Sequence, residues 1–301
     1  MAELILSLEG TAQGRTLALI LALTAAVLHA IFGALQKGRH DPWISRMAID
    51  SAYGIIALPI ALFVVPWPEP HMWPIFAGAF AIHLSYKLAQ GSTYVKGAYT
   101  VVYPVVRGTA PLFAVIGATI VFGETFSAGQ WLGVAVLMSG IFGLAVYNFV
   151  YLDVQRDTLP AALALAVLTG GLVALYTTWD AYGIRSTANP FTFLMWFFAI
   201  DGLTFPPLVL LFHRRAVARI HDWGALARRG LIGGLVAFGS FGSIMMATRL
   251  DKVGEAAVLR ETSTVFAALI GWLMLGENVG PRRLALMALI ALGAVIVEFS
   301  G

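Results

Sequence analysis

The feature that most constrains this chain is a series of long apolar stretches that recur from one end to the other. A bilayer core about 30 Å thick is crossed by roughly 20 helical residues, so each stretch has the length of a membrane-spanning helix. Only 12% of the 301 residues are charged, whereas soluble domains average about 25%. The sequence therefore excludes a soluble enzyme and predicts an all-α integral membrane protein. The ten predicted spans are 16–37, 42–65, 73–94, 98–122, 128–150, 160–183, 190–212, 226–248, 255–275 and 282–300.

The two halves of the chain repeat one another. Asp41-Pro42 opens the second predicted span as Asn189-Pro190 opens the seventh, each a side-chain cap followed by proline at the first helical position. Residues 105–140 laid on 258–293 share several residues of types that are rare here. We expect two five-helix repeats, 1–150 and 151–301, within one membrane domain. The shared rare residues are Arg107 with Arg260, Gly123 with Gly276 and Glu124 with Glu277.

Five spans per repeat is an odd number, so the second repeat enters the membrane from the opposite side. Positive residues gather in cytoplasmic loops, which allows the orientation to be predicted. With the N-terminus outside, Arg15, Arg185, Arg249 and Lys252 are the basic residues placed in external loops. We therefore expect an inverted repeat with both termini outside. The basic residues then placed in cytoplasmic loops are Lys37, Arg39, Arg46, Lys96, Arg156, Arg214, Arg215, Arg219, Arg228, Arg229, Arg282 and Arg283.

Two matching stretches carry a family resemblance: 97–113 running to Gly123-Glu124, and 254–263 running to Gly276-Glu277. They resemble the drug/metabolite transporter superfamily, in particular its ten-helix members with two EamA-type repeats, and among these the bacterial amino-acid and metabolite exporters. The resemblance implies a secondary transporter in a bacterial-type inner membrane. It also implies a central cavity within helices 1–4 and 6–9, with helices 5 and 10 outside.

Span four contains Pro104, Gly108 and Pro111. Each proline removes a backbone hydrogen bond, so we expect this helix to break or bend and to act as a gating hinge. In the second repeat Thr264 stands where the first has Pro111. The ninth span is therefore expected to be less broken than the fourth.

Arginines and an acid lie deep inside the predicted spans, where each ionisable group needs a partner, a water-filled cavity or a function. Arg107 and Arg260 are candidates for binding a substrate carboxylate, because a guanidinium group matches it with two hydrogen bonds. The alternative is a structural clamp in which Arg107 pairs with an acid of the second half. Glu261 is an acidic candidate for the cavity, and as the neighbour of Arg260 on a helix we expect it to face away from that arginine.

Span three places His83, Tyr86, Lys87 and Gln90 on one side at helical spacing. They form either a cavity wall or, for Lys87, a side chain that extends to the cytoplasmic interface.

Further candidates for the cavity lie in spans one, four and six. His29 is a possible proton carrier, with a hydrogen-bonded core histidine as the alternative. Asp180 follows an aromatic and polar run and is the leading acidic candidate, while Asp50, Asp201 and Glu255 are further intramembrane acids. The aromatic candidates for the lining are Phe32, Tyr99, Tyr103, Tyr176 and Trp179.

The pair Gly129 and Gly133 at the start of span five permits close helix approach. This surface packs either within the chain or against a second copy, although one chain is sufficient for transport in principle.

Other chemistries find no support in the sequence. The chain has no cysteine and no phosphate-binding glycine loop, and its histidines are scattered. We expect no cofactor, no metal, no nucleic-acid partner and no enzyme activity; a membrane-embedded lipid enzyme would need clustered acid, base or metal groups. Charges of both signs at membrane depth suit a zwitterion, and abundant aromatic residues favour large apolar side chains. The sequence predicts export of amino acids, with purines, sugars or quaternary amines as the alternative.

Overall fold

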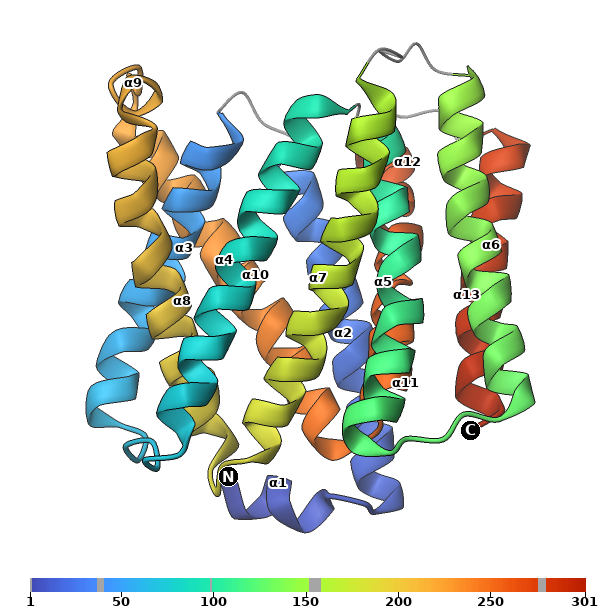
Figure 1. The fold of residues 1–301 in the computed structure, drawn as a ribbon, viewed down its shortest axis with the longest axis horizontal. Helices are drawn as coiled ribbons and strands as arrows, with labels where there is room; N and C mark the ends of the chain where they lie inside the picture. Colours follow the sequence, from blue (N-terminus) through green and yellow to red (C-terminus); the bar gives the residue numbers. More distant parts are fainter. Residues whose placement is uncertain (1, 37–40, 98, 152–157, 276–279) are drawn as a thin grey trace.

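The computed structural model describes residues 2–36, 41–97, 99–151, 158–275 and 280–301, and every regular element in these ranges is a helix (Figure 1). The helices are α1 (Ala2–Leu8), α2 (Ala12–Gln36), α3 (Pro42–Phe63), α4 (Met72–Lys96), α5 (Tyr99–Phe122), α6 (Ala128–Tyr151), α7 (Leu159–Arg185), α8 (Pro190–Phe212), α9 (Arg214–Val217), α10 (Trp223–Leu250), α11 (Val253–Arg260), α12 (Ser263–Leu275) and α13 (Pro281–Phe299).

The predicted helix starts are confirmed at α3 and α8. The Asp41 carboxylate accepts a hydrogen bond from the Trp43 backbone N–H at 2.8 Å, and the Asn189 side chain accepts one from Phe191 at 3.0 Å. Proline occupies the first turn of both helices, where no N–H is needed. The same local chemistry therefore begins the second long helix of each half.

Seven of the ten predicted spans are confirmed as helices long and apolar enough to cross a membrane: α2, α3, α5, α6, α7, α8 and α10. The other three, α4, α11 with α12, and α13, fall short for different reasons. Polar side chains such as His83 and Lys87 lower the hydropathy of α4, the ninth span is divided, and charges at both ends of α13 leave too short an uncharged stretch. A total of ten crossings remains a prediction.

The corresponding helices of the two halves run in opposite directions (Figure 1). α2 starts at the end of the bundle where α1 lies, whereas its counterpart α7 starts at the opposite end. The contacts between helices show the same relation between the two halves. α3 contacts its counterpart α8, and α6 contacts its counterpart α13, while α2 packs on α10 as α7 packs on α4. The two halves are thus arranged as a pair related by an approximate two-fold axis.

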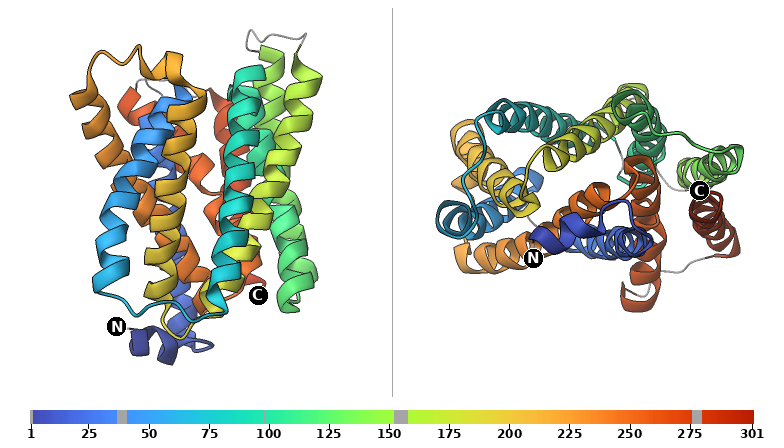
Figure 2. Two further views of the ribbon diagram at one scale, coloured as in Figure 1. Left: turned by 60° about the vertical axis from the view of Figure 1, so that its left-hand side comes forward. Right: turned by 90° about the horizontal axis from the view of Figure 1, so that it is seen from below.

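The α6–α13 pair lies to one side of the other helices, as Figure 2 shows in the view from below. Glycines allow the close approach: a Cβ added at Gly293 would stand 2.4 Å from the Leu137 backbone nitrogen and 2.6 Å from the Gly133 carbonyl oxygen. The face that carries Gly133 is therefore used for packing inside the chain. This result favours the first of the two interpretations of the Gly129/Gly133 pair.

The expectation that the ninth span is less broken than the fourth is wrong, and the fourth span is not interrupted; a bend at its prolines stays a prediction. α5 continues as one helix through Pro104 and Pro111, whereas the ninth span divides between Arg260 and Ser263 without a proline. At this division backbone N–H groups bond to carbonyls three residues earlier, as Thr262 does to Leu259 at 3.1 Å. The Thr262 side chain competes for backbone groups at this point, since its hydroxyl donates to the same Leu259 carbonyl at 2.7 Å.

Candidate substrate site

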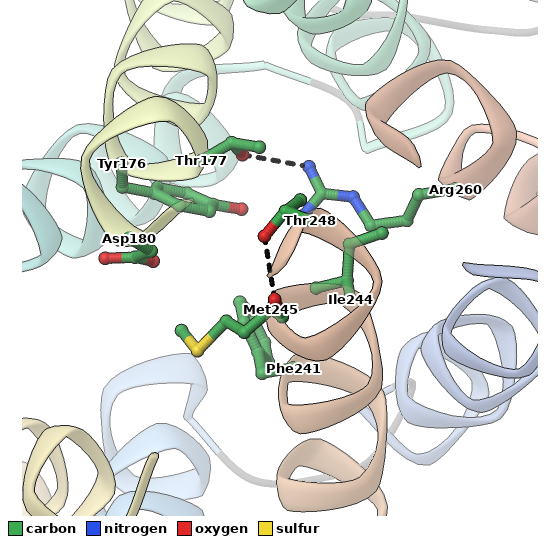
Figure 3. A pocket seen from close by; sticks show the side chains of 8 residues that line it. All are labelled: Tyr176, Thr177, Asp180, Phe241, Ile244, Met245, Thr248 and Arg260. Carbon is green, nitrogen blue, oxygen red and sulfur yellow. Dashed lines mark hydrogen bonds between the residues drawn. The ribbon is translucent and has the colours of Figure 1, made fainter. Parts of the chain in front are cut away.

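A small pocket lies between α7, α10 and the end of α11 (Figure 3). The space is narrow enough to hold on the order of one water molecule, so a larger solute can enter only if the walls separate. The lining residues are Tyr176, Thr177, Asp180, Phe241, Ile244, Met245, Thr248 and Arg260.

Two opposite charges line this pocket, and both are almost completely buried. Asp180 is 3% exposed and Arg260 is 4% exposed. One oxygen of Asp180, Oδ2, lies 2.9 Å from His83 Nε2 on α4. The Arg260 guanidinium donates a long hydrogen bond of 3.4 Å to the Thr177 hydroxyl and lies 5.9 Å from the centre of the Tyr176 ring. The pocket thus presents a carboxylate and a guanidinium group within an otherwise largely apolar wall.

A second charged cluster joins α3, α4 and α8. Lys87 Nζ lies 2.7 Å from Asp50 Oδ2 and 2.9 Å from Asp201 Oδ1. Arg46 Nε approaches the other Asp50 oxygen at 2.7 Å, and the Tyr53 hydroxyl donates to Asp201 at 2.5 Å. Lys87 therefore neither reaches the interface nor lines the pocket. It is the centre of a buried ion cluster that connects the two halves.

A third cluster forms where the ninth span divides. Arg107 on α5 lies 2.8 Å from Glu261 Oε2 and donates to the Ser263 hydroxyl at 2.9 Å. Arg260 Nε lies 4.0 Å from the other Glu261 oxygen. Arg107 is thus the structural clamp between repeats that the sequence left as one alternative. The expectation that Arg260 and Glu261 face apart is wrong, because the helix ends between them.

Glu124, which follows Gly123 at the end of α5, joins the two halves of the chain. Its carboxylate accepts hydrogen bonds from the Val253 and Gly254 backbone N–H groups at 2.7 and 3.1 Å, so a residue of the first half caps α11 of the second. The preceding residue, Gly123, has a φ of +65°, a conformation that glycine adopts without strain. Arg185 of α7 lies 3.7 Å from the same carboxylate.

The EamA-like transporter family matches this chain twice, over residues 16–146 and 160–299. The chain belongs to the EamA-like transporter family. One solved structure, described only as "Crystal structure of protein", aligns with a TM-score of 0.77 at 15% sequence identity, covering 94% of this chain and 99% of that one. This likeness supports the fold alone. No curated protein sequence matches the chain significantly.

Membership makes this chain a multi-pass membrane transporter of small molecules, and it confirms the predicted superfamily and its two EamA repeats. Of the residues that the sequence proposed for substrate binding, the structure places Tyr176, Asp180 and Arg260 around one pocket. Their role in this EamA-like transporter stays a prediction.

Several other predicted residues of the EamA-like transporter lie near the pocket without lining it. The His29 ring lies 6.1 Å from Phe32 and 6.4 Å from Phe241, and within the described ranges its nitrogens make no hydrogen bond. The Tyr86 ring lies 5.0 Å from Tyr176, and its hydroxyl accepts from Gln90 at 2.7 Å.

The remaining aromatic candidates have packing contacts. Trp179 donates to the Ile75 carbonyl at 2.9 Å and so ties α7 to α4. The Arg107 guanidinium lies 6.0 Å from the Tyr103 ring. The side chain of Tyr99, like all of Glu277, lies outside the described part of the structure. Gly108 packs closely on α6, where an added Cβ would stand 3.2 Å from the Phe142 ring.

The sequence did not point to the wall supplied by α10, namely Phe241, Ile244, Met245 and Thr248. These residues carry no charge and resemble the rest of an apolar span. The repeat itself is the available signal, because α10 is the counterpart of α4, which carries His83. Because the two repeats are related by an approximate two-fold axis, a polar site that includes residues of α4 is expected to include residues of its counterpart α10 on the opposite side.

Proposed function

We propose that this EamA-like transporter is a secondary transporter that exports amino acids, with large apolar or aromatic ones favoured over small ones. The observation that carries the proposal is the presence of buried Asp180 and Arg260 in the lining of one pocket. A zwitterion offers a partner to each charge, whereas an organic cation satisfies only the carboxylate and a phosphate ester only the guanidinium group.

The side-chain preference follows from the rest of the wall. Tyr176, Phe241, Ile244 and Met245 supply apolar and aromatic surface. Ligand pockets use such surface for contact area around a few polar anchors. An amino acid with a large apolar side chain therefore gains more contact here than glycine or alanine.

The proposed mechanism is alternating access, in which the two inverted repeats rock around the pocket. The narrow void supports it, because a solute needs the walls to separate. Contacts between the halves exist at both ends of the bundle: Glu124 with Val253 at one end, and Arg229 donating to the Leu35 carbonyl at 2.7 Å at the other. Each set must break when its own end opens.

We place the protein in a bacterial-type inner membrane with ten crossings and both termini outside. The bias of basic loops supports this orientation. Three of these basic residues, Arg214, Arg215 and Arg219, are exposed in the α8–α10 connection, at the end of the bundle opposite α1 (Figure 1). This end is therefore assigned to the cytoplasm.

The test is uptake of labelled amino acids into proteoliposomes, with and without a pH gradient. Unlabelled phenylalanine, methionine and leucine are expected to compete strongly, and glycine weakly. Competition by purines, sugars or quaternary amines, without competition by amino acids, would overturn the substrate assignment. Uptake that ignores the pH gradient indicates a facilitative exporter and removes the proposed proton-carrying role of His29.

A further inference from the structure

The buried charges of this transporter pair off within their clusters, with two exceptions. In the described part of the chain, Lys87 and Arg46 are matched by Asp50 and Asp201. Arg107 is matched by Glu261. Among the described residues, Asp180 has only His83 at 2.9 Å as an ion-pair partner, and Arg260 has only the 4.0 Å contact with Glu261, which it shares with Arg107. These two charges line the same pocket (Figure 3).

Resting on the proposed function, we propose that Asp180 binds the α-ammonium group of the transported amino acid and that Arg260 binds its α-carboxylate. The ammonium group of the substrate thus pairs with Asp180, and its carboxylate pairs with Arg260. The assignment gives the substrate one orientation, with its side chain against the apolar wall of α10.

One carboxylate oxygen of Asp180 is available as a hydrogen-bond acceptor. Its Oδ2 is engaged by His83 Nε2 at 2.9 Å, and His83 is a charged partner only when protonated. Its Oδ1 is buried and has no hydrogen-bond partner among the described residues. An ammonium group carries donors only, so it suits an acceptor-only carboxylate oxygen.

The Arg260 guanidinium group has N–H donors available for a further hydrogen-bond acceptor. Within the described ranges its Nε is buried without a hydrogen bond, and its bond to Thr177 is long at 3.4 Å. The nearest described carboxylate oxygen, Glu261 Oε1, lies 4.0 Å away, beyond hydrogen-bond distance, while the other Glu261 oxygen lies 2.8 Å from Arg107. One Glu261 charge thus faces two arginines. A carboxylate accepts two parallel hydrogen bonds from a guanidinium group. The Thr177 hydroxyl already donates to the Val173 carbonyl at 2.7 Å, so the guanidinium group of Arg260 supplies both donors.

The third contact of the substrate is between its side chain and the hydrophobic wall of the pocket. Phe241 lies one turn before Ile244 and Met245 on one face of α10. A substrate held at both charged groups can direct its side chain only toward the remaining lining. Met245 and Ile244 therefore select among side chains, while Asp180 and Arg260 select for the zwitterion.

The experiment compares three ligands that share one ring: phenylalanine, 2-phenylethylamine, which lacks the carboxylate, and 3-phenylpropionate, which lacks the ammonium group. Each competes against labelled phenylalanine in proteoliposomes. Ligand-induced thermal stabilisation of the purified protein gives a second measurement that does not require turnover. The quantity compared is the affinity ratio of each analogue to phenylalanine, which does not depend on the folded yield.

Wild-type protein is expected to prefer phenylalanine to both analogues. Asp180→Asn is expected to shift the ratio toward 3-phenylpropionate, and Arg260→Gln toward 2-phenylethylamine, each on the order of tenfold because a charge-assisted contact is lost. Asp201→Asn makes the same chemical change in a buried carboxylate outside the pocket. It is expected to leave both ratios unchanged.

The outcomes separate the two proposals. If wild-type protein binds phenylalanine but both pocket variants weaken all three ligands by the same factor, the assignment of the two charged contacts is overturned and amino-acid transport stands. Equal shifts in Asp201→Asn also overturn the assignment. If wild-type protein neither binds nor carries phenylalanine or any other amino acid, the proposed function fails and this assignment fails with it.

Discussion

Removal of the lysine at the centre of the α3–α4–α8 cluster is expected to destabilise the fold strongly. Lys87 contacts Asp50 at 2.7 Å and Asp201 at 2.9 Å, all within the protein interior. Breaking a buried ion pair from one side costs about 3–5 kcal/mol, because a charge is left without its partner. Asp50 keeps Arg46 at 2.7 Å, and Asp201 keeps the Tyr53 hydroxyl at 2.5 Å. We therefore expect Lys87→Met to lower the free energy of unfolding by about 3 kcal/mol, the lower end of that range.

A double-mutant cycle tests this origin. Asp201→Asn in the Lys87→Met background removes the stranded charge, so the double variant is expected to regain about 2 kcal/mol relative to the sum of the single variants. Denaturant unfolding in lipid–detergent micelles, followed by far-UV circular dichroism, measures each value. Lys96→Met makes the same substitution at the exposed end of the same helix and is expected to change stability by less than about 0.5 kcal/mol. Additive single and double variants would refute the reasoning.

Three further substitutions test the packing, the cap and the proposed hinge. Gly293→Leu is expected to lower the melting temperature by several degrees, because the first added carbon alone would stand 2.4 Å from a backbone nitrogen of α6. Gly171→Ala is expected to leave the melting temperature unchanged, because an added Cβ there meets nothing within 4 Å. Equal effects of the two substitutions would contradict the packing. Glu124→Ala is expected to cost about 1 kcal/mol of stability, the usual loss of a helix cap, and an unchanged denaturant midpoint would argue against its role on α11. The double substitution of Pro104 and Pro111 by alanine is expected to slow solute uptake at a normal folded yield, and normal turnover would remove the gating role.

Much of the architecture could be predicted from sequence because it depends on local chemistry. The caps at Asp41 and Asn189 follow from residue type and from the adjacent proline. The duplication is visible because Arg107 and Arg260 are rare in an apolar chain. Both features can be recognised in the sequence without knowledge of distant contacts, and both are present in the structure.

The pairing of buried charges could not be predicted, because it depends on how distant helices meet. Lys87 looked equally suited to a cavity wall and to the interface, and its partner Asp201 lies 114 residues away in sequence. Arg107 had an acid of the second half among its alternatives, but the sequence did not say which one. Helix packing decides these choices.

The position of the helix break illustrates a competing local signal. Proline in α5 indicated a break, yet two missing N–H groups do not interrupt a helix whose other hydrogen bonds remain. In the second repeat the helix divides at Thr262, whose hydroxyl competes for the Leu259 carbonyl. Thr262 was therefore the informative residue there.

The central claim is that an amino acid crosses the membrane through a site that opens to one side at a time. Exchange in proteoliposomes tests it most directly: vesicles preloaded with unlabelled phenylalanine take up labelled phenylalanine, and vesicles preloaded with a purine, a sugar or a quaternary amine serve as controls. The account predicts that internal phenylalanine accelerates uptake severalfold and that the controls do not. Acceleration by one of the controls, with none by phenylalanine, would contradict it.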